Sequence, residues 1–88
     1  MKKTTTYFVA REKDEEIYAC EGRETGMGRA IEGTTLIDHA YKAGSPGGLA
    51  RWMGGHYRRY IPVKVTDKIE RTLEDATFPP EEELFPDY

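Results

Sequence analysis

Apolar and polar residues alternate most clearly at the start of the chain, and this alternation predicts a β-hairpin. In residues 4–13 (TTTYFVAREK), one face carries Tyr7, Val9 and Arg11 and the other carries Thr6, Phe8 and Ala10. A period of two over β-branched and aromatic residues is typical of a strand. A polar turn at 14–16 and a second apolar segment at 17–21 (IYACE) complete the predicted hairpin.

The same alternation returns in residues 57–66 (YRRYIPVKVT) and predicts a third strand, with Ile61, Val63 and Val65 facing inward. Proline cannot donate a hydrogen bond to a β-ladder, so Pro62 is expected at a sheet edge or a bulge.

Helical spacing predicts three short helices. The first covers residues 35–43, where apolar positions recur at helical intervals. The second begins at Ser45, an N-cap residue followed by Pro46 in the first turn, and ends at the glycine pair 54–55. The third covers 67–76, which opens with a D-x-x-E start signal.

Residues 22–33 contain four glycines and mixed charge, which predicts a flexible loop. The element order therefore predicts an α+β fold: a small three-stranded sheet, made of the hairpin and one later strand, covered by short helices. We expect one domain over residues 1–75 and an extended acidic tail over 76–88, because the 88 residues leave no room for a second domain.

Charge is divided unevenly along the chain. Residues 1–73 hold all 13 Lys and Arg against ten acids, whereas the last fifteen residues hold six acids and no base, for a net charge of −3. The first part is thus mildly basic and the end strongly acidic. Such asymmetry reports on partners rather than on the fold.

The acidic tail interleaves carboxylates with aromatic and apolar side chains, and its three prolines favour an extended backbone. Three roles are open: a solubilising disordered end, a peptide arm that enters a partner's groove, or a cover over the basic part of its own domain. For the second role the candidate partner-binding residues are Glu81, Glu82, Glu83, Leu84, Phe85, Asp87 and Tyr88.

Residues 51–60 (RWMGGHYRRY) combine basic and aromatic side chains and contain no acidic residue. Guanidinium groups pair with phosphates and aromatic rings stack on bases, so this segment could bind nucleic acid or an acidic partner. The candidate residues are Arg51, Arg58, Arg59, Tyr60 and Lys64. In the alternative interpretation, Trp52 anchors the core and the arginines form a solvated rim.

No catalytic or metal-binding motif is present in the sequence. His39 and His56 lie seventeen residues apart without Cys or carboxylates at ligand spacing, which argues against a metal site. Cys20 is expected to be a buried, inert thiol, and the glycine-rich residues 44–48 lack the G-K-[ST] of a phosphate-binding loop. We therefore expect no enzyme activity and no cofactor.

The cysteine count and the apolar segments also predict the cellular compartment of the protein. A single cysteine permits no intrachain disulfide, which favours a reducing environment. The start of the chain lacks the apolar run of a signal peptide, and no stretch has the length of a membrane span. These features predict a soluble, cytoplasmic protein without a membrane partner.

Three parts of the chain, 7–13 (YFVAREK), Tyr18 and 60–66 (YIPVKVT), resemble a pattern in small orphan proteins of phages and prophages of Gram-positive bacteria. Those proteins open with a Y-x-V hairpin and close with a P-V-x-V-T strand. The resemblance implies an accessory phage protein made in the host cytoplasm, of a kind that binds and inhibits host machinery, including defence nucleases.

Two functional hypotheses follow. In the first, the chain is a non-enzymatic protein-binding module that inhibits a host nucleic-acid-processing or defence enzyme, in the manner of anti-CRISPR or anti-restriction proteins. Its acidic tail would imitate nucleic-acid phosphates. The alternative is a small nucleic-acid-binding accessory protein that uses residues 51–64, with the tail as an electrostatic gate. The identity of the partner and the oligomeric state stay open.

Overall fold

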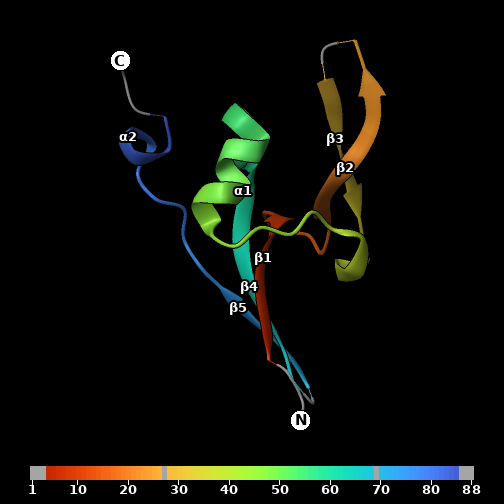
Figure 1. Cartoon of the computed structure of the whole chain (residues 1–88), viewed down its shortest axis with the longest axis vertical. Coiled ribbons are helices and arrows are strands. Elements are labelled where there is room, and N and C mark those ends of the chain that lie inside the picture. Colours follow the sequence, from red (N-terminus) through yellow and green to blue (C-terminus); the bar gives the residue numbers. More distant parts are fainter. Residues whose placement is uncertain (1–3, 27, 69, 86–88) are drawn as a thin grey trace.

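The computed structural model describes residues 4–26, 28–68 and 70–85, and over these it forms one five-stranded antiparallel sheet with strand order β3-β2-β1-β4-β5 (Figure 1). The strands are β1 (Thr5–Glu12), β2 (Tyr18–Thr25), β3 (Gly28–Thr34), β4 (Tyr60–Asp67) and β5 (Arg71–Asp75). The helical elements are the 3₁₀ turn η1 (Ile37–His39), helix α1 (Pro46–Met53), the 3₁₀ helix η2 (Gly54–Arg59) and the short helix α2 (Glu81–Leu84).

The prediction of an α+β fold with three strands covered by short helices is wrong. The described residues are mostly β, and α1 is the one helix among them with more than six residues. The predicted flexible loop at 22–33 instead forms most of the β2–β3 hairpin, with an irregular register between Glu21 and Glu24. Its many glycines conceal the alternation that identifies a strand, because glycine adds no side chain to the pattern.

The predicted helix at 67–76 is also wrong, because this segment forms the β4–β5 turn and β5. Leu73 lies opposite Val65, and Arg71 lies opposite Asp67. Pairing with β4 satisfies the backbone groups on the second side of that strand, which a surface helix would leave open. Ile69, part of the predicted helical stripe, lies outside the described residues.

The predicted helix at 35–43 reduces to the single turn η1, followed by extended backbone. Ala43 and Phe8 exchange two backbone hydrogen bonds, at 2.8 and 3.0 Å, and the Tyr41 amide donates to the Ala19 carbonyl at 3.0 Å. Residues 41–43 thus lie between β1 and β2. Backbone groups buried there need partners, and this demand overrides the local helical pattern.

The helix predicted to begin at Ser45 is confirmed as α1. The Ser45 hydroxyl oxygen accepts a hydrogen bond from the Gly48 amide at 3.1 Å, and Pro46 occupies the first turn. Gly54 ends the helix with a positive φ of 62°, a conformation that glycine adopts without steric strain.

Pro62 lies within β4, between β1 and β5, rather than at a sheet edge as predicted. Its carbonyl accepts from the Ala76 amide at 2.8 Å. The nitrogen and the carbonyl of one strand residue face the same side. The Pro62 nitrogen therefore faces the chain just beyond the end of β5, where the missing N–H breaks no bond of the β4–β5 ladder.

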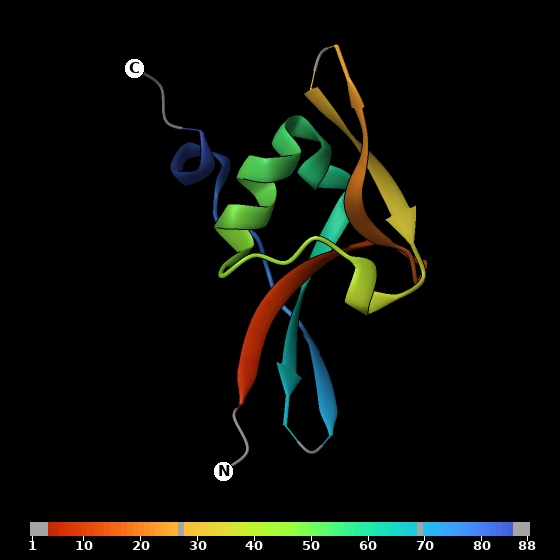
Figure 2. The ribbon, with the colours of Figure 1, turned by 45° about the vertical axis from the view of Figure 1, so that its right-hand side comes forward.

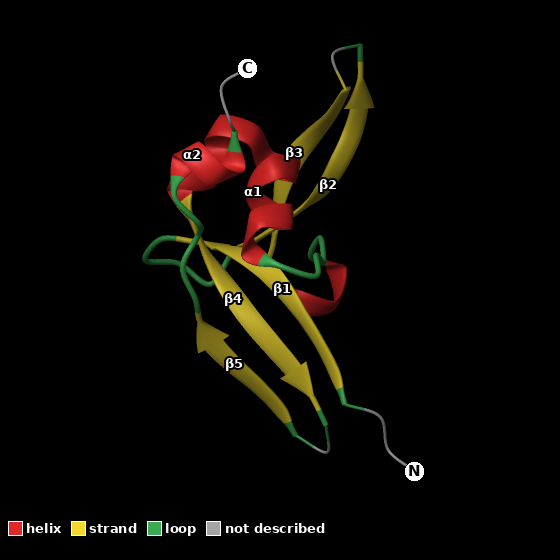
Figure 3. Cartoon of the chain, turned by 60° about the vertical axis from the view of Figure 1, so that its left-hand side comes forward, coloured by secondary structure: helices red, strands yellow, loops and turns green. Residues whose placement is uncertain are grey.

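The two faces of the sheet carry separate cores. On one face, Val9, Val63 and Val65 are fully buried and are joined by Tyr7 and Tyr18. On the other, α1, η2 and the C-terminal residues cover Ala10 and Phe8. Figures 2 and 3 show α1 and α2 side by side over this second face, with the β2–β3 hairpin extending past them. Within the described ranges, no helix has the length and apolar character needed to cross a bilayer.

Candidate functional site

Residues 76–85, called the acidic segment below, fold back onto the domain. Leu84 is 2% exposed and belongs to the same core as Leu49 and Met53. Phe78 meets the ring of Tyr57 edge to face, with centroids 5.3 Å apart. Residues 76–85 thus pack against their own domain in this structure. The predicted boundary after residue 75 therefore separates β5 from a segment that shares the domain's core.

The acidic segment also makes an ion pair with the basic part of the chain. Arg58 on η2 donates to the carboxylate of Glu81, and its guanidinium lies 5.4 Å from the ring centroid of Tyr57. Glu82 and Glu83 are exposed and make no ion pair with any described residue. Helix α2 thus exposes two carboxylates to solvent, and the packing of Leu84 in the core holds the helix in place.

The predicted partner-binding residues of the tail take different positions. Leu84 points into the protein's own core, so it cannot contact a partner in this conformation. Phe85 is 41% exposed and its ring centroid lies 6.0 Å from that of Tyr57. Asp87 and Tyr88 lie outside the described residues.

The predicted basic surface does not form one continuous patch, because η2 has about three residues per turn and sends successive side chains in different directions. Tyr57 points into the core, Arg58 points to α2, and Arg59 lines a pocket. Arg51 is exposed on α1, and Lys64 lies in the middle of β4 opposite Phe8.

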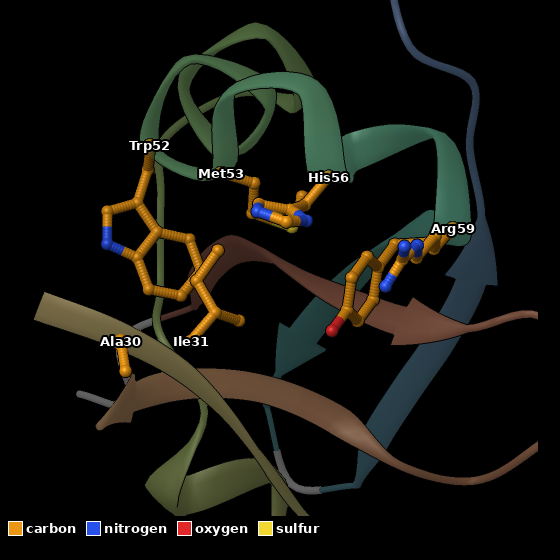
Figure 4. Close-up of a pocket in the computed structure, with 7 residues that line it drawn as sticks. Ala30, Ile31, Trp52, Met53, His56 and Arg59 are labelled. Carbon is orange, nitrogen blue, oxygen red and sulfur yellow. The ribbon is translucent and has the colours of Figure 1, made fainter. Parts of the chain in front are cut away.

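The structure does bring Arg59 and Tyr60 together in a pocket of about 460 Å³ between β3 and the α1–η2 segment. Its lining residues are Ala30, Ile31, Trp52, Met53, His56, Arg59 and Tyr60. Figure 4 shows four of the labelled side chains descending from the helical segment and Ile31 rising from the strand below, with Ala30 beside it on the same strand.

Trp52 is held at this pocket by a stacked contact with Tyr41, whose ring centroid is 4.0 Å away at an interplanar angle of 11°. It is half-buried and packs at the margin of the core. Sequence reasoning missed Ile31 because it fell in the predicted loop, where no alternating pattern marked it. It missed the pocket for the same reason, since one wall is β3.

Two groups near the pocket titrate above their ordinary range. Burial, and next the carboxylate of Glu12, raise the pKa of Tyr60. Burial, and next the charge of Glu32, raise the pKa of the Cys20 thiol. Cys20 is half-buried in β2, less enclosed than the sequence suggested. No group of His, Cys, Asp and Glu in the described part of the chain has the arrangement of a metal site.

A second charged cluster joins the β4–β5 hairpin to η1. Arg71 donates to Asp67 and Asp38, each at 2.7 Å, and the Tyr7 hydroxyl donates to Asp67 at 3.1 Å. The hydrogen bond from Arg71 is the largest cause that lowers the pKa of Asp67. This cluster positions the sheet and η1 rather than opening a cavity.

No family model, curated protein or solved structure matches this chain.

Proposed function

We propose that the chain is a small non-enzymatic accessory protein, of the phage type that its sequence resembles, and that it acts by binding a protein partner. The partner class is a nucleic-acid-processing or defence enzyme with a basic groove, and the carboxylates of the acidic segment take the place of phosphates there. The observation that supports this proposal is the burial of Leu84, which fixes α2 with Glu82 and Glu83 facing solvent.

Packing of the acidic segment lowers the entropic cost of binding. A disordered acidic tail must be ordered when it meets a partner, whereas a helix docked through Leu84 and Phe78 is already in place. Consecutive carboxylates at fixed spacing can then meet several cations of one groove. Their long-range attraction speeds encounter more than it strengthens the final complex.

Phe85 supplies the apolar contact that charge alone lacks. Exposed ion pairs are individually worth only about 0–1 kcal/mol, and aromatic side chains dominate the energetics of most interfaces. Phe85 is 41% exposed beside the carboxylates of α2, so we assign it as the anchor of the interface.

The alternative of nucleic-acid binding along residues 51–64 has weaker support. Arg58 is neutralised by Glu81, and Arg51, Arg59 and Lys64 lie on different elements rather than along one track. A continuous basic groove is what single-strand binding proteins use to follow the backbone.

The test is affinity capture from bacterial lysate with the full-length chain, identification of the captured protein, and competition with double-stranded DNA. We expect a nucleic-acid enzyme that DNA displaces. The double variant Glu82→Gln/Glu83→Gln should capture less of this enzyme in a short incubation at low salt, because its association is slower. The matched control, Glu15→Gln/Glu16→Gln in the exposed β1–β2 turn, carries the same charge change and should capture the usual amount. Equal capture by both variants, or a partner indifferent to DNA, would contradict the proposal.

A further inference from the structure

The pocket between β3 and η2 collects polar groups that have no partner among the described residues. Neither the Arg59 guanidinium nor the His56 imidazole, both on exposed residues, forms a hydrogen bond or ion pair with any residue that the structure describes. Arg11, Arg58 and Arg71, by contrast, each pair with a carboxylate. Donors that converge on a cavity and remain unpaired are available to a ligand.

The pocket also separates an apolar end from a cationic end. Trp52 lies at one end, with Ile31 beside it, and Arg59 lies at the other, as Figure 4 shows. His56 and Arg59 are three residues apart on η2. Side chains at that spacing in a 3₁₀ helix point in the same direction, so both face the pocket.

We propose that this pocket binds one nucleotide unit, with the base against Trp52 and the phosphate between Arg59 and His56. An aromatic ring and an aliphatic wall suit the flat face of a base, and a guanidinium suits a phosphate in geometry and charge. The volume of about 460 Å³ falls in the ordinary range of small-ligand pockets, about 300–1,000 Å³.

The lining residues also predict how selective the site is. Base identity is read by amide, carboxylate and guanidinium side chains that match the donors and acceptors of a base edge. None of the lining residues has an amide or carboxylate side chain, the whole chain contains no Asn or Gln, and the one lining guanidinium, Arg59, is assigned to the phosphate. The site therefore recognises the class of ligand, a base with a phosphate, and discriminates little among the four bases.

The phosphate belongs at the Arg59 end because Arg59 is the one lining residue with a permanent positive charge. No lining residue belongs to the acidic segment, so this site and the proposed partner-binding surface are separable by substitution.

Trp52 is the only tryptophan in the chain, so its fluorescence reports on the pocket directly. The experiment titrates the full-length protein with AMP, CMP, GMP and UMP, and then with adenosine and ribose 5-phosphate. We expect all four nucleotides to quench Trp52 with affinities within about fivefold of one another, because the pocket lacks base-reading groups. The two fragments should each bind at least about tenfold more weakly, since each lacks one half of the contacts.

Two arginine variants test the geometry. Arg59→Gln should weaken AMP binding at least about tenfold and leave adenosine binding unchanged, because it removes only the phosphate contact. Its matched control is Arg58→Gln, one residue away but paired with Glu81 on the other side of η2, which should bind AMP normally. Trp52→Phe, followed by calorimetry, should keep part of the affinity because a ring remains for stacking.

A short single-stranded oligonucleotide distinguishes a free nucleotide from a unit within a strand. Comparable affinity for AMP and the oligonucleotide assigns a free nucleotide. Much tighter binding of the oligonucleotide assigns a strand, and both results support the site. Absence of quenching and of heat at millimolar AMP would overturn the proposal. Equal losses in Arg58→Gln and Arg59→Gln would also overturn it, because binding would then reflect net charge alone.

Discussion

Tyr57 and Phe78 meet edge to face, with ring centroids 5.3 Å apart and ring planes at 78°. The contact joins η2 to the acidic segment, and Leu84 enters the same core a few residues later. What the sequence presents as an appendage is therefore a structural part of the domain. The charged residues of α2 owe their fixed position to these buried neighbours.

Leu84→Ala should lower the free energy of unfolding by about 2–4 kcal/mol, because it leaves a cavity in the core next to α1. Phe85→Ala, one residue later but 41% exposed, should lower it by less than about 1 kcal/mol. Urea denaturation of both variants measures the difference. Similar stability of the Leu84 variant and the unchanged protein would show that the acidic segment is not docked in solution.

Leu49 rather than Trp52 should be the main anchor of α1. The Leu49 side chain is fully buried, whereas Trp52 is half-buried at the pocket margin. Leu49→Ala should cost about 2–5 kcal/mol, and Trp52→Phe, which preserves an aromatic ring, less than about 1.5 kcal/mol. Thermal melts rank the two variants. A larger loss in Trp52→Phe would restore the sequence-based assignment of Trp52 as the anchor.

Gly47→Ala should stabilise the protein by about 0.5 kcal/mol, because alanine favours the helix and restricts the unfolded chain. A methyl group at Gly47 would lie 3.6 Å from Nη1 of Arg51 and 3.8 Å from Cδ2 of Leu84, which are ordinary contacts. Gly22→Ala is the contrasting case, because its methyl group would lie 2.9 Å from the Ala30 carbonyl oxygen. That variant should be less stable, by about 1–3 kcal/mol. Urea midpoints that shift in the same direction would contradict the strand pairing at Gly22.

Acid should remove the contribution of Asp67 to stability. The pKa of Asp67 in the folded protein lies below its ordinary value of 3.8, chiefly because Arg71 donates to the carboxylate. A lowered folded pKa means that the stabilisation is complete above the ordinary value and is lost as the pH falls through the folded value. Asp67→Asn should therefore be less stable than the unchanged protein at pH values near neutrality, and the difference should shrink below about pH 4. Urea titrations at neutral and acidic pH check this, and a pH-independent difference would argue against the Asp67–Arg71 interaction.

The sequence predicts those elements whose local signal agrees with the tertiary structure. The alternation around Tyr7 and Val9 marks β1, and Ser45 with Pro46 marks the start of α1. The D-x-x-E signal at Asp67 misleads because that carboxylate accepts from Arg71 across a hairpin instead of capping a helix. Whether a carboxylate caps a helix or forms an ion pair depends on which element lies beside it, and only the tertiary structure determines that.

The sequence likewise indicates some residues of the candidate site and not others. The basic-aromatic segment indicates Arg59 and Tyr60, and both line the pocket. Ile31 comes from a distant hairpin, so no local pattern links it to them. The sequence favours a partner contact for Leu84 because apolar residues in an acidic tail resemble exposed anchors, whereas in the structure Leu84 packs in the protein's own core.

We propose that the fixed carboxylates of α2 form the partner-binding surface. The association rate of the captured partner, measured by surface plasmon resonance at low and high salt, tests this proposal. Glu82→Gln/Glu83→Gln should slow association mainly at low salt, since screening already weakens the charges at high salt. The matched Glu15→Gln/Glu16→Gln variant should associate at the normal rate. Equal slowing in both variants, or no slowing in either, would contradict the claim.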